Sequence, residues 1–304
     1  MGGVHASQLA HYGHEVTVVD RSPEVLARIR GEGLTIRKPD GTESTIRVEA
    51  RDSTEGLAEP DFLFFFVKAH VTSYAARGAA GIVGDHTVAV SVQNGWGHGE
   101  ALAEALPASR IVVGVTRQGA TPLAPGVVLH YGAGETVLGA WAGDDLGPAR
   151  RAADLLASAG LPASASSDAL GMIWEKLVFN AGFSSVPSII GRSAYSLKLL
   201  PDALRLAVGV STEAVQVANA LGHIGISVDE HVLAPAERFF EKIEAAGGIG
   251  GKPSMLIDIE NRRRTEVDAI NGALLREGAR LGLALPLNTA VTALLKGIES
   301  NWQD

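Results

Sequence analysis

Runs of apolar residues separated by amphipathic stretches mark the first part of the chain. The β-branched run at residues 14–20 ends in an acid, and Ser22 and Pro23 then supply a cap and a first-turn proline for a helix. Further near-continuous apolar runs follow at residues 62–67, 87–92 and 110–115. Such runs predict strands that are covered on both faces, and helical stretches separate them. We therefore expect a parallel, doubly wound α/β sheet.

The pattern changes twice along the rest of the chain. At residues 119–140 short apolar stretches are broken by Pro, Gly and aromatic residues, which predicts an antiparallel extension at the edge of the sheet. After about residue 164 a helical period replaces the strand pattern. Helices are expected at residues 168–184, 201–221, 229–246, 255–262 and 266–281, and in a last segment that ends near residue 302. The predicted domains are an α/β domain at residues 1–165 and an all-α domain at residues 166–304.

The first residues carry part of a dinucleotide-binding motif. Rossmann-like sites begin with a buried strand and a glycine turn that leads into a helix. Gly2 or Gly3 stands where the last glycine belongs, and Asp20 lies near the spacing of a ribose-contacting acid. The first strand is absent, and because it is central in the usual order we expect a gap in the sheet and a start codon assigned too late. A glycine pair before an ordinary N-terminal helix is the alternative.

Two later glycine clusters are not expected to bind phosphate. Residues 132–137 have a valine where the third glycine of the dinucleotide motif belongs, and we interpret them as a turn. Residues 247–252 resemble a phosphate loop, but Pro253 replaces the required hydroxyl residue and no strand is predicted before them. We interpret this second cluster as a loop between helices.

Composition limits the classes of function. With 304 residues, of which 46% are hydrophobic, the chain can bury two cores. A net charge of -8 and a pI near 5.6 argue against a nucleic-acid or anionic-membrane surface. The absence of cysteine excludes disulfides, thiol nucleophiles and thiolate-bound metals, and we expect no metal site. The apolar run at residues 62–67 is too short to cross a bilayer, so we expect a soluble protein, with the cytoplasm as the default compartment.

Candidate chemical residues lie at predicted strand ends and on one helix face. Lys68 and Asn94 each follow a strand at the carboxyl edge, where open α/β sheets bind ligands. A solvated lysine and a turn-forming Asn-Gly pair are the alternatives. Lys176, Asn180 and Ser184 recur every four residues, so one face of a helix presents a cation, an amide and a hydroxyl. Lys176 could equally extend from the flank of that helix into solvent.

Ser254 and Glu266 can share a small ligand only if the chain bends between them. A straight helix would separate them by roughly 18 Å. Thr265 is a good N-cap, which predicts a new helix with Glu266 at its first position. Glu266 then faces inward, or it only complements the helix dipole. A lysine paired with a side-chain carboxylate can protonate a carbonyl as hydride arrives. The Ser254 hydroxyl and the N–H groups near it can bind the carboxylate of a substrate. Together these residues predict a reductase.

These motifs together resemble the ketopantoate reductase (2-dehydropantoate 2-reductase) family over essentially the whole chain. The motifs that carry the resemblance are Lys68, Gln93-Asn94-Gly95, Gly114-Val115-Thr116, Gly119-Ala120-Thr121, Glu175-Lys176-Leu177 with Asn180, Ser254-Met255-Leu256, and Thr265-Glu266-Val267-Asp268 with Ile270-Asn271-Gly272. The resemblance implies reduction of 2-dehydropantoate to pantoate with hydride from NADPH, a step of pantothenate biosynthesis. A small 2-keto acid is then the expected partner.

The resemblance also implies a role for each candidate residue. Lys176 is expected to be the general acid that donates a proton to the ketone oxygen, and Glu266 to bind the hydroxyl and orient the lysine. The expected substrate-binding residues are Asn180, Ser184, Ser254 and Asn94. The expected cofactor-binding residues are Gly2, Gly3, Asp20, Arg21, Lys68, Asn94 and Glu266.

Departures from the family pattern leave alternatives open. Ser184 stands where members that act on ketopantoate usually carry a second asparagine, and Gly251 and Lys252 stand where another asparagine is often found. A bulkier or differently branched 2-keto acid therefore remains an alternative substrate. Asp20 favours the free 2′-hydroxyl of NAD, whereas Arg21 favours the 2′-phosphate of NADP. Another 2-hydroxyacid dehydrogenase and a non-catalytic dinucleotide-binding relative stay open, as does the oligomeric state, with a homodimer as one option.

Overall fold

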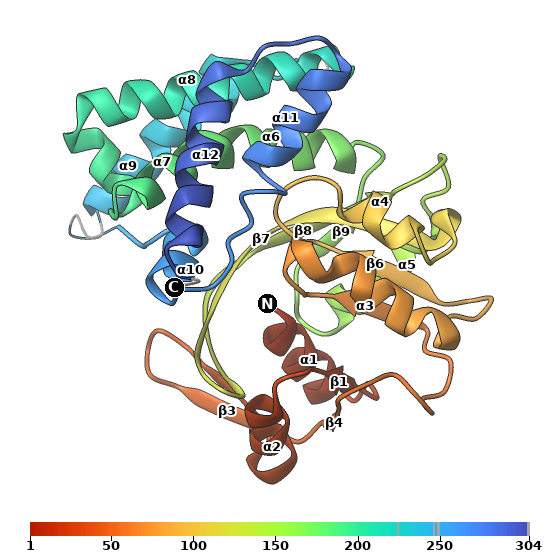
Figure 1. Cartoon of the computed structure of the whole chain (residues 1–304). Coiled ribbons are helices and arrows are strands. Elements are labelled where there is room, and N and C mark those ends of the chain that lie inside the picture. Colours follow the sequence, from red (N-terminus) through yellow and green to blue (C-terminus); the bar gives the residue numbers. More distant parts are fainter. Residues whose placement is uncertain (224, 246, 248–249, 303–304) are drawn as a thin grey trace. The chain divides into compact units, whose positions relative to one another are not determined.

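The computed structural model of the chain describes residues 1–223, 225–245, 247 and 250–302 (Figure 1). By its internal contacts the chain divides into two compact units. The first unit comprises Met1–Gln93 and His98–Leu170, and the second comprises Asn94–Gly97 and Gly171–Asp304. The short loop Asn94–Gly97 therefore groups with the second unit, although it lies within the sequence of the first.

A seven-stranded sheet forms the larger part of the first unit. Its strands are β2 (Leu34–Arg37), β3 (Glu43–Ile46), β5 (Phe62–Phe65), β6 (Val88–Ser91), β7 (Ile111–Ala124), β8 (Val127–Ala140) and β9 (Ala163–Ala165). The order is β3-β2-β8-β7-β6-β5, with β9 beside β8. β5, β6 and β7 run parallel, and every residue of β6 is buried, as the continuous apolar sequence predicts. The predicted fold class, a parallel-rich α/β sheet followed by helices, is confirmed.

The hairpin of β7 and β8 corrects two predictions. Short edge strands were expected, but each strand has 14 residues and the pair lies in the middle of the sheet, because β2 adds to β8 on its far side. Register shifts, such as the one between Thr116 and Gln118, absorb the irregular sequence. The turn predicted at residues 132–137 is wrong, because these residues continue β8. A Cβ added at Gly132 would lie 2.7 Å from the Gly119 nitrogen, so the glycine serves close strand contact.

A break in the strand order divides the first unit into two sheets. β1 (Thr17–Val19) pairs in parallel with β4 (Glu49–Arg51), and these two form a sheet of their own (Figure 1). The gap in the sheet that the sequence predicts is therefore present. β2, β3 and β4 were not predicted from the sequence, because each is short and most of their residues are polar or exposed.

Helices complete the first unit. They are α1 (Gly2–His11), α2 (Pro23–Glu32), α3 (Thr72–Ala79), α4 (His98–Ala103) and α5 (Gly147–Ser158), with 3-10 turns η1 (Ala69–Val71), η2 (Ala80–Ile82) and η3 (Ala108–Arg110). The Ser22 hydroxyl accepts a hydrogen bond from the Val25 N–H at 3.3 Å, and Pro23 stands in the first turn. The predicted cap of α2 is therefore confirmed.

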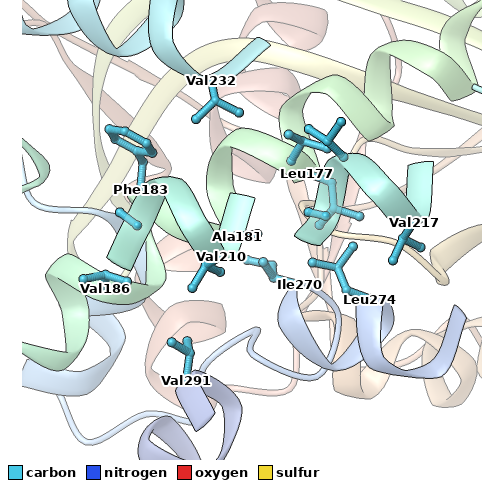
Figure 2. Packing of buried hydrophobic residues seen from close by; sticks show 14 of the residues in the cluster. Leu177, Ala181, Phe183, Val186, Val210, Val217, Val232, Ile270, Leu274 and Val291 are labelled. Atoms are coloured by element: carbon cyan, nitrogen blue, oxygen red, sulfur yellow. The ribbon is translucent and has the colours of Figure 1, made fainter. Parts of the chain in front are cut away.

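The described part of the second unit is helical. Its helices are α6 (Ala169–Phe183), α7 (Ser185–Ile189), α8 (Pro201–Ala220), α9 (Ala234–Ala245), α10 (Ser254–Glu260), α11 (Asn271–Arg280) and α12 (Pro286–Ser300), with a 3-10 segment η4 (Ala194–Leu199) and a π-helical segment η5 (Asp229–Leu233). Figure 2 shows their apolar side chains meeting in one core, with Leu177, Ala181 and Ile270 among them. The predicted helix at residues 266–281 begins later, at Asn271.

The glycine cluster at residues 247–252 falls between α9 and α10, as predicted for a loop, although residues 248–249 lie outside the described residues. Within the described ranges, no helix is both long enough and apolar enough to cross a membrane.

Burial of His98 should make the stability of the fold depend on pH. His98 is 5% exposed and its Nδ1 is buried without a hydrogen-bond partner. Burial lowers the pKa of His98 from 6.5 to about 4. The unfolded chain therefore takes up this proton at a higher pH than the folded chain does. The contribution of the uncharged His98 to the unfolding free energy is fully present above pH 6.5. This contribution is lost as the pH falls toward about 4.

We predict that His98→Leu flattens the dependence of the unfolding free energy on pH by about 1.4 kcal/mol per pH unit within this window. Urea denaturation at a series of pH values measures the slope. The same substitution at the exposed His86 is the control for losing any histidine. An unchanged slope in His98→Leu would contradict the buried, uncharged state.

Candidate functional site

One face of α6 carries the predicted chemical side chains. Lys176 and Asn180 are partly exposed, whereas Leu177 and Val178 are 1% and 0% exposed. Figure 2 shows Leu177 pointing into the helical core, whereas the partly exposed Lys176 and Asn180, four residues apart, lie together toward the outer side of the helix. The Ser184 N–H donates to the Asn180 carbonyl at 3.0 Å, which keeps Ser184 one turn further along the same face. α6 therefore carries Lys176 and Asn180 one turn apart, whereas Ser184 follows the end of the helix and is buried, and a shared substrate-binding role of the three stays a prediction.

Glu266 lies in a turn directly before α11, and not in the first turn of a helix. The N–H groups of Ala269 and Ile270 both donate to the Glu266 carbonyl at 3.0 Å. The Thr265 hydroxyl accepts from the Val267 N–H at 3.2 Å, so Thr265 caps the turn in the way predicted for a helix. Glu266 itself is 9% exposed. The Glu266 side chain is therefore largely withdrawn from solvent.

Ser254 begins α10, and this helix ends at Glu260. The predicted break in the chain before Glu266 is therefore present. Ser254 is exposed, whereas Met255 and Leu256 that follow it are 2% exposed and bury the other face of α10. The hydroxyl is free of the core, and its contact with a substrate stays a prediction.

The loop Asn94–Gly97 joins α6 to the turn that carries Glu266. The Trp96 N–H donates to the Ala269 carbonyl at 2.8 Å, and the Trp96 ring lies 5.2 Å from the ring of Trp174 in α6. Gly95 has a φ of 87°, and a Cβ added there would lie 2.3 Å from the Ala269 oxygen. Only glycine allows this approach, so the Asn-Gly pair docks the loop as well as turning it. Asn94 is thus carried by a segment that contacts both neighbours.

Asn271 fastens the same turn to α6 from the inside of the unit. It is 0% exposed, and its Nδ2 donates to the Ala181 carbonyl at 3.1 Å and to Asn288 Oδ1 at 3.0 Å. Its Oδ1 accepts from the Ser185 hydroxyl at 2.6 Å. Ala181 follows Asn180 in α6, and Asn271 follows the turn directly. One buried amide therefore links the backbones of two site segments. Sequence reasoning noted Asn271 as part of a motif and assigned it no role.

Gln93 holds the segment that follows β5 and leads to Lys68. Its side-chain Nε2 donates to the Val67 carbonyl and, at 3.0 Å, to the Thr72 hydroxyl. Its Oε1 accepts from the Ser91 hydroxyl at 3.0 Å. Sequence reasoning missed this function. The available signal was a large amide at the end of a buried strand, since such a group must find partners inside the protein.

Gly2 and Gly3 begin α1 in a crowded place of the first unit. A Cβ added at Gly2 would lie 3.1 Å from a neighbouring side chain, and one added at Gly3 would lie 3.0 Å from another. Burial and the nearby charge of Lys68 lower the pKa of the Met1 amino group, so the lysine charge reaches the start of α1. Small residues and a cation at a helix N-terminus fit an anionic pyrophosphate.

Asp20 and Arg21 follow β1. Asp20 Oδ1 accepts the Ser22 N–H at 2.8 Å, and the Arg21 guanidinium carbon lies 4.9 Å from the centre of the Tyr74 ring. An acid and an exposed cation side by side fit the ribose end of a dinucleotide. Contact of these residues with a cofactor stays a prediction. Over the described residues, no group of three or more metal-binding side chains occurs.

Comparison with known proteins covers both units of the chain. The family model of ketopantoate reductase PanE/ApbA matches residues 1–143, and the model of its C-terminal domain matches residues 168–299. A 2-dehydropantoate 2-reductase of Halobacterium salinarum is 30% identical over 296 residues, which is 97% of this chain and 95% of that protein. One from Archaeoglobus fulgidus is 29% identical over 99% of this chain and 95% of that protein.

Solved structures share the fold. A ternary structure of D-mandelate dehydrogenase with NADH and anilino(oxo)acetate has a TM-score of 0.92 at 27% identity, covering 100% of this chain and 96% of that one. A PanE/ApbA family ketopantoate reductase from Ralstonia eutropha JMP134 has a TM-score of 0.86 at 25% identity, covering 99% and 95%. The resemblance expected from the motifs is confirmed, and the chain belongs to the ketopantoate reductase family, whose members are oxidoreductases that act on CH–OH groups.

Proposed function

We propose that the protein reduces 2-dehydropantoate to pantoate with NADPH, in pantothenate biosynthesis. The observation that carries the proposal is the meeting of three segments in the second unit. The loop Asn94–Gly97 contacts α6 through Trp174 and the Glu266 turn through Ala269. Lys176, Asn180, Asn94 and Glu266 therefore belong to segments that touch one another. Membership of the ketopantoate reductase family supports the same reaction.

The residues of the second unit supply the parts of a ketone reduction other than the hydride. When a reduced nicotinamide dinucleotide is bound, it supplies the hydride. As the carbonyl carbon accepts the hydride, its oxygen gains negative charge, which the Lys176 ammonium stabilises and then neutralises by donating a proton. The Glu266 carboxylate attracts the ammonium and accepts a hydrogen bond from the substrate hydroxyl. Asn180 and Asn94 donate amide hydrogen bonds, and the Ser254 hydroxyl binds the substrate carboxylate.

Residues of the first unit would hold the dinucleotide. Gly2, Gly3 and Lys68 fit the pyrophosphate by size and charge. Arg21 is exposed next to Asp20, and an arginine at this place supports NADPH because its guanidinium can pair with the 2′-phosphate.

A second candidate function is the reduction of a bulkier 2-keto acid with NADH. The D-mandelate dehydrogenase structure at a TM-score of 0.92 was solved with NADH, which favours this alternative. Ser184 stands on the Lys176 face in place of a second asparagine, and it is 9% exposed. A serine has one hydroxyl and less volume than an asparagine, so it removes an amide contact for a small polar substrate and leaves more space for a larger one.

The two candidates differ in a substrate panel. We expect the highest kcat/KM with ketopantoate and NADPH, because an amide-bearing and hydroxyl-bearing face suits the hydroxyl and carboxylate of that substrate. Oxidation of NADPH and of NADH should be followed with ketopantoate, 2-oxoisovalerate and phenylglyoxylate. A higher kcat/KM for phenylglyoxylate with NADH would favour the second candidate, and no oxidation with any keto acid would reject both.

Removal of the general acid should slow the chemical step. We expect Lys176→Ala to lower kcat by on the order of 10²-fold or more, because no proton donor would then meet the developing oxyanion. Lys176 is partly exposed, so the variant should fold, which circular dichroism can check. The exposed Lys242 of α9 provides a matched Lys→Ala control in the same unit. A Lys176→Ala protein with unchanged kcat would refute the acid role.

Removal of the Ser254 hydroxyl should weaken substrate binding. We expect Ser254→Ala to raise the KM for the keto acid several-fold with little change in kcat, because the hydroxyl contacts the carboxylate in both the ground state and the transition state. Steady-state kinetics at saturating cofactor separate the two parameters. An equal loss in kcat with an unchanged KM would place Ser254 elsewhere in the reaction.

A further inference from the structure

Helix α12 holds the Glu266 turn on both sides of Glu266. Thr265 is 1% exposed, and both its N–H and its hydroxyl donate to Glu299 Oε1, at 2.7 and 2.5 Å. Lys296, one turn earlier in α12, contacts both carboxylate oxygens of Asp268, at 2.6 and 2.7 Å. The Glu299 carboxylate of α12 thus accepts from Thr265, the residue before Glu266. The Lys296 ammonium of α12 donates to Asp268, two residues after Glu266.

The Asp268 side of this attachment is ionic and well partnered. Burial raises the pKa of Asp268, but hydrogen bonds from Lys296 and Arg264 and their charges outweigh burial, so the net pKa lies below its usual value. The Arg264 side chain donates to Asp268 Oδ2 at 3.0 Å, and Arg276 donates to the Asp268 carbonyl at 2.8 Å. The carboxylate therefore stays charged at neutral pH, and the turn cannot rotate without breaking several of these contacts.

α12 is itself fixed in the helical core. Glu213 of α8 accepts from the N–H groups of Leu287 and Asn288, at 2.9 Å each, and so caps the first turn of α12. Val291 and Leu295 are 1% and 0% exposed, and Figure 2 shows Val291 in the packed interior. The capped first turn and the buried face anchor α12 in the core, so α12 can support the residues that contact it.

We propose that Glu299 and Lys296 are positioning residues for the reduction, and this inference rests on the proposed function. They fix the backbone on the two sides of Glu266, so that its carboxylate is held toward Lys176. Both act through Glu266, since their contacts are with Thr265 and Asp268. A misplacement of about 1 Å at a catalytic group can cost about 10²-fold in rate, so loss of either contact should appear in kcat.

The Glu299 contact can be tested with a matched pair of variants. Glu299→Gln keeps an oxygen that can accept from both Thr265 donors, whereas Glu299→Ala removes it. We expect Glu299→Ala to lower kcat about 10-fold or more, with the cofactor KM changed less than two-fold, and Glu299→Gln to restore most of the loss. Glu244→Ala, which removes a surface pair with Lys198, is the control for deleting a charged contact in the same unit.

A double-mutant cycle separates positioning from general destabilisation. If Glu299 acts through Glu266, Glu299→Ala should lower kcat little further in a Glu266→Gln background, with the double mutant still folded by circular dichroism. Thr265→Ser, which keeps both donors, should retain activity. Wild-type kcat in a folded Glu299→Ala protein, or multiplicative kcat losses in the double mutant, would overturn the positioning role. Absence of wild-type turnover with every keto acid would instead reject the proposed function, and this inference with it.

Discussion

The arrangement of the site depends on one buried amide, that of Asn271. Its Nδ2 and Oδ1 bind Ala181, Asn288 and Ser185, and the side chain has no exposed surface. A buried donor left without its partner costs about 1–3 kcal/mol, so the amide strongly favours a single separation between the Glu266 turn and α6. The position of Lys176, the predicted general acid, relative to Glu266 is therefore set by the interior of the helical unit, and not by a surface loop.

The irregular backbone around Glu266 is explained by the hydrogen bonds that this turn makes with neighbouring segments. In a helix begun at Glu266, the Ala269 carbonyl would point along the axis toward the N–H of residue 273. In the turn it accepts from Trp96 instead, which docks the loop that carries Asn94. The delayed start of α11 thus allows one short segment to bind the loop, α6 and α12. Helical propensity around residues 266–270 is overridden because these tertiary contacts satisfy the same backbone groups.

Sequence reasoning found the parts of the site whose signals are local. The four-residue spacing of Lys176 and Asn180 and the capping threonine before Glu266 could be read directly, because helix faces and caps depend on near neighbours. The supports could not be found in this way. Glu299 meets Thr265 across 34 residues, and Asn271 meets Ser185 across 86. Nothing in either local sequence distinguishes these side chains from an ordinary surface glutamate or a helix-start asparagine.

Strand order was beyond sequence reasoning for a related reason. A continuous apolar run identifies a buried strand but not its neighbours, so the central place of β7 and β8 could not be predicted. What connects the two sheets of the first unit is again a matter of packing. In α1, Val4 joins the core of the seven-stranded sheet, while Ala6 joins the core beside β4. In β2, Ile36 joins the core of the seven-stranded sheet, and Leu34 joins the core beside β4. The helix that begins with Gly2 and Gly3 therefore fixes the sheet carrying Asp20 against the sheet carrying Lys68.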